Sequence, residues 1–250
     1  MSYDIPNFSP AIPELLVFSL GTLALLVQAF WGQKRPAITY GFVQLTILLT
    51  GFFTLGYLND STVLTFDNMF ILDKLAVILK LFIELAVFLC FVYSRVYLAE
   101  NNMPRGEYYI LGLYAMLGMM VLVSSHHYLT LYLGVELMAL PVYAMVAMKR
   151  ESGFAAEAAM KYFIIGAMAS GMLLYGISMI YGATGNLEFT TVASAIANTA
   201  IEQQLILVFG LVFIMVGIAF KLGAVPFHMW LPDVYQGAPN PVTLFIASGT

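Results

Sequence analysis

Charged side chains are scarce in this chain of 250 residues, of which only 10% are Asp, Glu, Lys or Arg. An average soluble domain contains about 25% charged and about 45–50% apolar residues. Here 61% of the residues are hydrophobic, which excludes an ordinary soluble domain and indicates a polytopic membrane protein. The net charge of -4 says little about partners, because nearly all of the charge lies between the apolar runs.

Cysteine is almost absent as well. The one cysteine, Cys90, lies inside an apolar run, so the sequence predicts neither a disulfide framework nor a cysteine metal site. There is no glycine-rich phosphate loop and no basic patch with interleaved aromatic residues. We therefore expect this chain to bind no nucleotide, flavin, metal or nucleic acid. A basic N-terminal region with a cleavage site is also missing, so we expect the first apolar run to be retained.

Seven apolar runs have about the ~20 residues that are needed to cross a hydrocarbon core. They lie at 12–31, 37–57, 69–99, 107–123, 128–148, 154–181 and 205–222. A short half-helix at 228–236 and the start of an eighth helix at 241–250 follow, and a pattern at 191–196 predicts a short interfacial helix. The expected fold is an all-α transmembrane bundle with one broken helix near Gly223–Pro226, in a single membrane domain.

The basic residues of the short loops predict the orientation. Alternate loops contain no Lys or Arg, whereas the others carry six: Lys34, Arg35, Arg95, Arg105, Lys149 and Arg150. Because basic residues favour the cytoplasmic side, we expect the N-terminus to lie outside.

The seventh run ends in an unusual way. It carries Lys221 where a span should be purely apolar, and Gly223 and Pro226 then interrupt the helix. A helix that is broken at membrane depth is tolerated only where its backbone lines protein or water. An ionisable side chain in the same place indicates function. Lys221 and the broken helix together predict an ion path. His228 suits a proton relay in that path; the alternative is a histidine that only caps the broken backbone.

Glu136 lies in the middle of the fifth run, and an isolated carboxylate there needs a cationic partner. Lys161 in the sixth run is about 8 residues, or ~12 Å of helix rise, beyond a short connecting loop. Because short loops join antiparallel neighbours, we expect Glu136 and Lys161 to lie at similar depth and to pair. Lys161 and Lys221 would then compete for Glu136, and their titrations would be coupled. The alternative is an ion pair that only orients the bundle.

Other charges lie inside or beside the spans. Lys80 and Glu84 are one helical turn apart and can pair with each other, either for function or as a purely structural neutralised pair. Lys74 is expected to reach the membrane interface. Asp233, just beyond the break, would either cap the half-helix or serve as a counter-charge.

Three segments together carry a family resemblance. They are Leu131-Tyr-Leu-Gly-Val-Glu-Leu-Met-Ala-Leu-Pro141, Glu157-Ala-Ala-Met-Lys-Tyr-Phe163 and Phe220-Lys-Leu-Gly-Ala-Val-Pro-Phe-His-Met-Trp-Leu-Pro-Asp233. These segments resemble the antiporter-like, proton-translocating membrane subunits of respiratory complex I, the NADH–quinone oxidoreductase. The continuation Val234-Tyr-Gln-Gly-Ala-Pro239 is most similar to one branch of that family. The resemblance is strong over residues 107–250 and weak before them. It implies three N-terminal transmembrane helices in 1–106 and a first antiporter-like repeat in 107–250.

The resemblance also implies roles for residues. Lys221 would be the pump lysine, Glu136 the glutamate that modulates it, Lys161 an additional conducting lysine and His228 the link toward the centre of the membrane. The family has a second, inverted repeat and a further lysine in helix 8, so we expect this chain to be the N-terminal half of a longer protein.

The resemblance places the redox chemistry elsewhere. FMN, iron–sulfur clusters and quinone are expected in partner subunits and not in this chain. The expected partners are the other membrane and peripheral subunits of the complex, the lipid bilayer and protons. The expected location is the bacterial inner membrane, which we prefer over the thylakoid membrane and the mitochondrial inner membrane.

Two other functions compete with this one. A subunit of a multisubunit sodium/proton antiporter belongs to the same wider family, but the segment Tyr235-Gln-Gly-Ala-Pro239 favours the oxidoreductase. A purely structural membrane scaffold is disfavoured by the buried charges.

Overall fold

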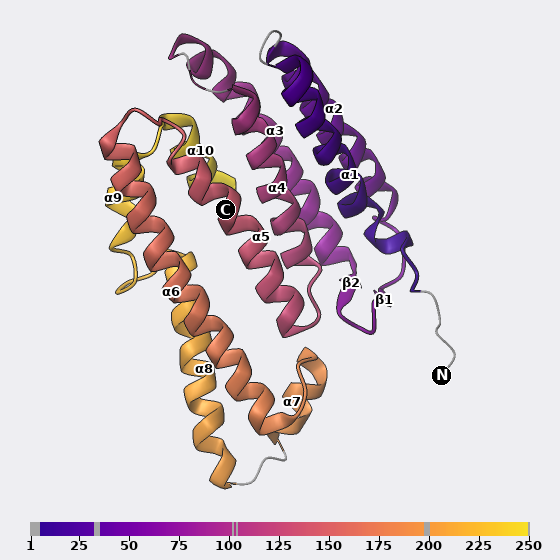
Figure 1. Cartoon of the computed structure of the whole chain (residues 1–250). Helices are drawn as coiled ribbons and strands as arrows, with labels where there is room; N and C mark the ends of the chain where they lie inside the picture. The colour runs from indigo at the N-terminus through magenta and orange to yellow at the C-terminus, as the bar shows by residue number, and fades with distance from the viewer. Residues whose placement is uncertain (1–5, 33–35, 102, 104, 198–200, 250) are drawn as a thin grey trace.

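The computed structural model describes residues 6–32, 36–101, 103, 105–197 and 201–249, and the side chains of 201–203 and 249 lie outside that description. The chain is helical almost throughout (Figure 1). The α-helices are α1 (Ile12–Val27), α2 (Pro36–Gly56), α3 (Lys74–Glu100), α4 (Arg105–Val123), α5 (Tyr128–Val146), α6 (Gly153–Thr184), α7 (Phe189–Ala197), α8 (Ile201–Lys221), α9 (Trp230–Gly237) and α10 (Asn240–Gly249). A 3₁₀ turn (Ser9–Ala11) precedes α1, and a π-helical turn (Gln28–Gly32) continues it.

Seven of these helices are long and apolar enough to cross a membrane: α1 with its flanking turns, α2 to α6, and α8. The prediction of an all-α transmembrane bundle with seven spans is therefore confirmed. The short helix predicted at 191–196 is present as α7, and the predicted half-helix and final helix are α9 and α10. Lys34 and Arg35, which contributed to the predicted orientation, lie outside the described residues.

The third span begins later than the sequence predicted. Residues 69–73 were expected to be helical, but β2 (Phe70–Leu72) pairs with β1 (Val63–Thr65) in an antiparallel hairpin. The helix starts at Lys74 because Asp73 accepts a hydrogen bond from the Ala76 N–H at 2.7 Å, as an N-terminal cap does. The apolar strand residues look like a continuation of the helix when only hydrophobicity is considered.

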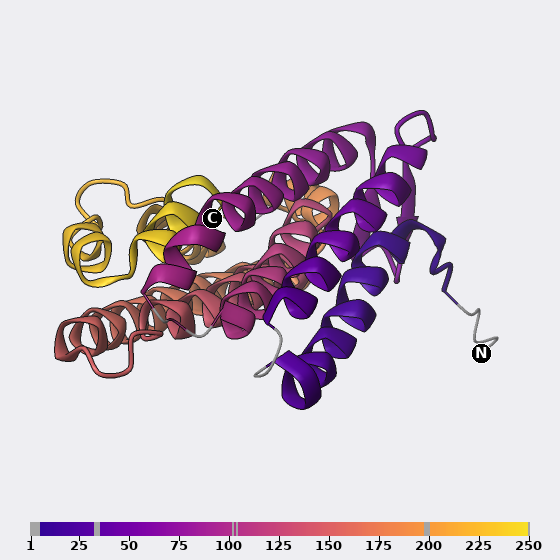
Figure 2. The same cartoon turned by 90° about the horizontal axis from the view of Figure 1, so that it is seen from above.

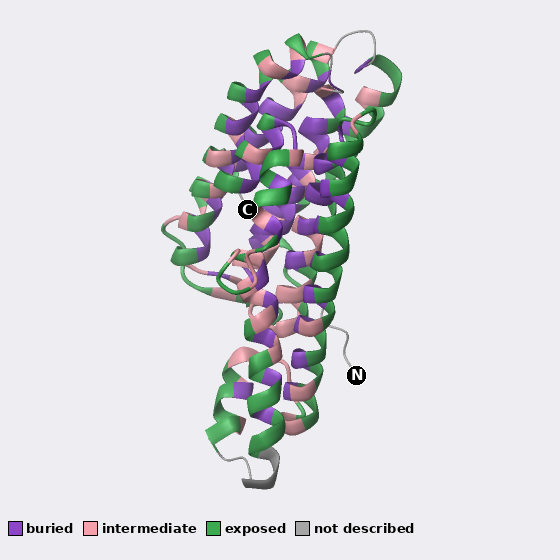
Figure 3. Cartoon of the chain, turned by 90° about the vertical axis from the view of Figure 1, so that its left-hand side faces the viewer, coloured by how far each residue is buried: buried purple, intermediate pink, exposed green. Residues whose placement is uncertain are grey.

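The helices are arranged around α4, the most buried of the seven candidate spans, which contacts α1, α2, α3 and α5. From above, α1 and α2 lie at one side of the bundle and α9 and α10 at the other (Figure 2). Buried residues run along the interior, and exposed residues cover the outer faces (Figure 3). The outer faces carry large apolar side chains such as Phe18, Phe52 and Phe82, as expected for a surface in contact with lipid.

The start of α5 is held by the loop that follows α6. The Tyr128 N–H donates to the Leu187 carbonyl at 2.9 Å, and the His127 Nδ1 accepts a hydrogen bond from the Leu129 N–H at 3.2 Å. The Glu188 carboxylate accepts hydrogen bonds from the Thr190 and Thr191 hydroxyls, which lower its pKa. The bonds of the Tyr128 and Leu129 N–H groups fix where α5 begins, and the helix then places Glu136 about two turns further on.

Two helix pairs approach closely at glycines. A Cβ at Gly118 of α4 would lie 2.2 Å from the Met138 backbone nitrogen of α5. A Cβ at Gly176 of α6 would lie 2.6 Å from the Gly210 carbonyl oxygen of α8. Small residues at helix contacts are how membrane helices gain packing without a hydrophobic driving force. The pairs α4–α5 and α6–α8 therefore position α5 and α8, which carry the candidate site.

We predict that Gly118→Val separates α4 from α5 and destabilises the protein, since backbone atoms cannot move aside as side chains do. Overpacking of this kind costs about 1–3 kcal/mol or more. The control is Gly41→Val on α2, because no atom lies within 4 Å of a Cβ at Gly41. The thermal unfolding midpoint of the detergent-purified protein measures both. Equal midpoints for the two variants would show that the close approach contributes nothing.

Candidate functional site

The α8 helix ends at Lys221, and the chain is not helical again until α9 begins at Trp230. Gly223 has a positive φ of 63°, a conformation that favours glycine at the end of a helix. Its N–H donates to the Phe220 carbonyl at 3.0 Å, and the Trp230 indole N–H donates to the same oxygen at 3.0 Å. The carbonyl freed by the break is therefore satisfied, and the predicted broken helix is confirmed.

Lys221 faces Glu136 across the bundle. Its Nζ lies 4.0 Å from the Glu136 Oε1, and 14% of the lysine side chain and 23% of the glutamate side chain are exposed. The Lys221 Nζ also donates a hydrogen bond to the Tyr143 hydroxyl at 3.1 Å and lies 5.5 Å from the centre of that ring. The Ser170 hydroxyl donates to the Glu136 Oε1. Helices α5, α6 and α8 thus each contribute a side chain to one half-buried group, in which Glu136 and Lys221 are charged and Tyr143 and Ser170 are polar.

The approach of Tyr143 depends on a glycine. A Cβ at Gly166 of α6 would lie 2.1 Å from the Tyr143 hydroxyl oxygen. Glycine at this position therefore leaves the space that the Tyr143 hydroxyl occupies beside Lys221.

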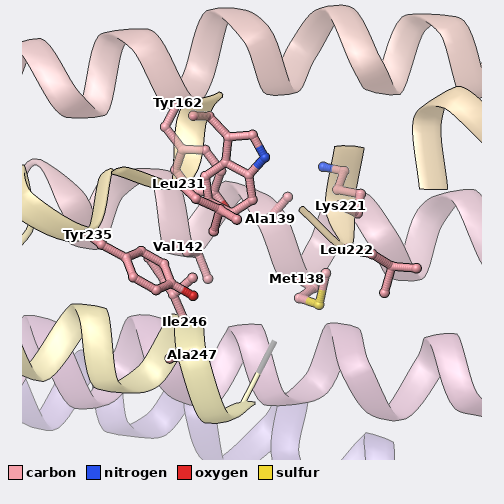
Figure 4. A pocket seen from close by; sticks show the side chains of 11 residues that line it. Met138, Ala139, Val142, Tyr162, Lys221, Leu222, Leu231, Tyr235, Ile246 and Ala247 are labelled. Atoms are coloured by element: carbon pink, nitrogen blue, oxygen red, sulfur yellow. The ribbon is translucent and has the colours of Figure 1, made fainter. Parts of the chain in front are cut away.

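Lys221 lines two cavities. The first has a volume of about 180 Å³, and its wall includes Tyr162, Trp230 and Tyr235. Figure 4 shows Lys221 on one side of this cavity and Tyr162 and Tyr235 on the other. The second cavity has a volume of about 350 Å³, and its wall, which includes Ile83, is almost entirely apolar. Both exceed the ~10–15 Å³ that one water molecule needs. The first cavity, which has polar groups in its wall, is therefore large enough to hold water beside Lys221.

The predicted pairing of Lys161 with Glu136 is wrong. The Lys161 Nζ instead lies 2.9 Å from the Asp233 Oδ2 and 2.9 Å from the Glu157 Oε1, and 43% of its side chain is exposed. Ser170, which does contact Glu136, lies nine residues further along α6, about 13 Å of rise. Nine residues also correspond to half a turn in projection, so Lys161 and Ser170 point to opposite faces of α6. Depth and direction both exclude the predicted pair, and Lys221 alone of the two lysines faces Glu136.

Asp233 is a counter-charge rather than a cap, since its carboxylate pairs with Lys161 and so joins α9 to α6. His228 lies within the break. Among the described residues it makes no hydrogen bond to Lys221, Lys161 or Glu136, and its Nδ1 is buried without a partner. Lys221 and Asp233, on either side of the break, thus have ionic partners, whereas His228 has none within the described part of the chain.

The predicted pair of Lys80 and Glu84 is also wrong. The Lys80 Nζ lies 2.5 Å from the Glu14 Oε1, and Glu84 contacts the Thr54 hydroxyl at 2.8 Å. The two residues share a face of α3, but Glu14 of α1 is better placed for Lys80. Lys74 is the first residue of α3 and is exposed, so its ammonium group can reach the membrane interface without being buried.

Sequence reasoning missed two polar contacts of the site. Tyr143 lies seven residues after Glu136, two turns along the same face of α5, and this spacing is a signal that the sequence does contain. Ser170 had no such signal, because it lies among small residues that also suit helix packing.

The family model described as "NADH:quinone oxidoreductase/Mrp antiporter, TM" matches residues 125–250, half of the chain. Subunit N of NADH-quinone oxidoreductase from Coxiella burnetii is 52% identical over 99% of this chain and 52% of its own length. Subunit N from Hydrogenovibrio crunogenus is 50% identical over 99% of this chain and 52% of its own length. The chain thus spans about half the length of the curated relatives that it matches.

Two solved structures have the same fold. A chain of respiratory complex I from Thermus thermophilus with bound aureothin matches with a TM-score of 0.79 and 29% identity, covering 95% of this chain and 50% of that one. A chain of the membrane-bound sulfane sulfur reductase, an archaeal respiratory membrane complex, matches with a TM-score of 0.80 and 24% identity, covering 97% and 52%. The second match shows the fold alone. By its sequence over residues 125–250, the chain belongs to the NADH:quinone oxidoreductase/Mrp antiporter transmembrane family.

Proposed function

We propose that this chain forms part of a proton pathway in subunit N of a bacterial NADH–quinone oxidoreductase. The observation that carries the proposal is the pair of Glu136 and Lys221, held at the end of a broken membrane helix beside a cavity. The relatives from Coxiella burnetii and Hydrogenovibrio crunogenus carry the name of that subunit, which favours the oxidoreductase over a sodium/proton antiporter.

Lys221 would carry the proton. An ammonium group inside a membrane is costly without a counter-ion, so its charge depends on Glu136. Lys221 and Glu136 form an ion pair at 4.0 Å, and a small movement of either side chain would shorten or lengthen this distance. If Glu136 moved away, Lys221 would lose its stabilising charge and release a proton; if Glu136 returned, Lys221 would take up a proton. The Tyr143 hydroxyl, which has lone pairs for the ammonium and a hydrogen for the neutral amine, suits both states.

The cavity beside Lys221 would connect it to the membrane surface. Its walls include Tyr162 and Tyr235. Tyr162 lies next to Lys161 on α6, and Tyr235 lies two residues after Asp233 on α9. The half-exposed pair of Lys161 and Asp233 would therefore be the entrance or exit of the path. His228, in the break between α8 and α9, would link the path toward the centre of the membrane.

We infer the arrangement in the membrane from the basic residues. Arg95 lies in the last turns of α3, and Arg105 begins α4. Arg150, in the α5–α6 loop, pairs with Glu107 near the start of α4 at 3.0 Å, so these basic residues gather at one end of the bundle. With this end in the cytoplasm, the N-terminus lies outside a bacterial inner membrane. Residues 1–106 would then supply three N-terminal spans and residues 107–250 a first antiporter-like repeat.

The chemistry that drives the path would take place in other subunits. Electron transfer from NADH to quinone needs FMN and iron–sulfur clusters, and we expect partner subunits to carry them. This chain would receive their energy as a movement or a change of charge near Glu136.

We predict that Lys221→Ala and Glu136→Gln each remove most of the NADH-driven proton uptake into membrane vesicles, because each leaves one charge without its partner. Both are made in the full-length subunit, with assembly of the complex checked alongside. Lys74→Ala is the control, since Lys74 is exposed at the start of α3. Normal uptake in the Lys221→Ala variant would leave the broken helix as architecture only.

We also predict that Tyr143→Phe and Gly166→Ala reduce proton uptake to a similar degree. The first removes the hydroxyl that contacts Lys221, and the second fills the space where that hydroxyl lies. A hydrogen bond to a charged group contributes about 1.5–3 kcal/mol. The matched control is Gly171→Ala on the same helix, where no atom lies within 4 Å of a Cβ. If Gly166→Ala and Gly171→Ala gave the same uptake, Tyr143 would have no part in the path.

A further inference from the structure

A second group of buried charges lies in the first three spans, and the proposed proton path does not use it. It consists of Glu14 on α1 and Lys80 and Glu84 on α3, which are 5%, 0% and 3% exposed. Glu14 lies in the first turn of α1, and Lys80 and Glu84 lie in the first half of α3. Both helices begin at the end of the bundle that carries the β1–β2 hairpin (Figure 1). Charged residues this deeply buried in a membrane protein are costly unless they are paired.

Lys80 already has its counter-ion. Its Nζ lies 2.5 Å from the Glu14 Oε1 and 5.0 Å from the centre of the Phe70 ring in the hairpin. Glu84 follows Lys80 by one turn of α3, yet no ion pair between them occurs in the part of the chain that is described. Glu84 is therefore a surplus carboxyl group beside a neutralised pair.

The surroundings of Glu84 suit a carboxyl group in either protonation state. Its Oε1 lies 2.8 Å from the Thr54 hydroxyl, which in turn lies 2.9 Å from the Thr50 carbonyl oxygen. An ionised Glu84 accepts the hydrogen of Thr54. A protonated Glu84 donates to the Thr54 oxygen, and the hydroxyl hydrogen then turns to the Thr50 carbonyl. The same heavy-atom positions serve both states.

The other oxygen of Glu84 has no hydrogen-bond partner among the described residues; the same is true of the Glu14 Oε2, but Glu14 has the Lys80 ammonium beside it and Glu84 does not. It faces Gly51 of α2, where a Cβ would lie 3.3 Å away. An ionised carboxylate would normally have both oxygens hydrogen-bonded when it is this deeply buried. An unpartnered oxygen on a buried carboxyl group is more easily accommodated when the group is neutral.

We propose that Glu84, together with Glu14 and Lys80, is a proton-binding site in helices α1, α2 and α3, separate from the Lys221 site. Two carboxylates and one ammonium carry a charge of −1 when all are ionised, and one proton from water on a Glu84 oxygen makes the group neutral. That proton returns to water when Glu84 ionises.

The neighbours of Glu84 add no further charge. Glu14 and Lys80 are the charged groups that act on it, and α2 contributes the Thr54 hydroxyl. From α4 and α10, which also pack against α3, no charged residue acts on Glu84 in the described part of the chain. Proton binding at Glu84 does not depend on proton transfer through Lys221.

The test is infrared difference spectroscopy of the full-length protein in its membrane complex, titrated with acid. We expect a carbonyl band of a protonated carboxylic acid that is lost in Glu84→Gln. The matched control is Glu100→Gln on the same helix, where the glutamate is exposed, and it should keep the band. A band that persists in the Glu84→Gln protein would overturn the proposal.

A second variant tests the division of roles. In Glu14→Gln, Lys80 loses its counter-ion, so Glu84 should ionise to replace it and the acid band should disappear although Glu84 is still present. An unchanged band in that variant would contradict the proposal. Glutamine has the size of a protonated glutamate and can donate to Thr54, so Glu84→Gln should also assemble normally. Failure of that variant to assemble would mean that the folded protein requires the ionised form, which overturns the proposal as well.

Discussion

Lys221 and Glu136 face each other at 4.0 Å across α5 and α8, in a place where neither charge is stable alone. Their meeting imposes several requirements on the neighbouring helices. α8 has to end at Lys221, and the break has to satisfy its own backbone, which Gly223 and Trp230 achieve at the Phe220 carbonyl. The site therefore lies at the last helical residue of α8, directly before a break whose backbone is satisfied within the protein.

Close packing of α6 connects this site to the rest of the bundle. At one end, glycines let α6 and α8 approach until a Cβ at Gly176 would lie 2.6 Å from a backbone oxygen. At the other end, the Trp230 ring stacks on the Tyr162 ring with centres 4.6 Å apart. These two rings belong to α6 and α9, and the ion pair of Lys161 and Asp233 joins the same two helices. A movement of α9 would therefore be transmitted to the wall of the cavity that Lys221 lines.

Much of this architecture could be predicted from the sequence, because hydrophobic runs and helix-breaking residues are local signals. The seven spans and the break at Gly223 belong to this class. The partners of charged residues were harder, since they depend on helix rotation and register. Lys161 lay in the expected helix but on the wrong face, and Lys80 found Glu14, a residue 66 positions earlier in the chain. The apolar strand β2 was mistaken for helix because burial alone does not distinguish the two.

The central claim is that Lys221 carries a proton and does more than supply a positive charge. Arginine keeps the charge and can pair with Glu136, but it does not release its proton in proteins. The most direct measurement is NADH-driven proton uptake into membrane vesicles that contain the full-length subunit with Lys221→Arg, beside Lys149→Arg at an exposed loop. We predict that the Lys221→Arg complex assembles but loses proton uptake, whereas Lys149→Arg retains it. Undiminished uptake in the Lys221→Arg complex would contradict proton transfer through Lys221.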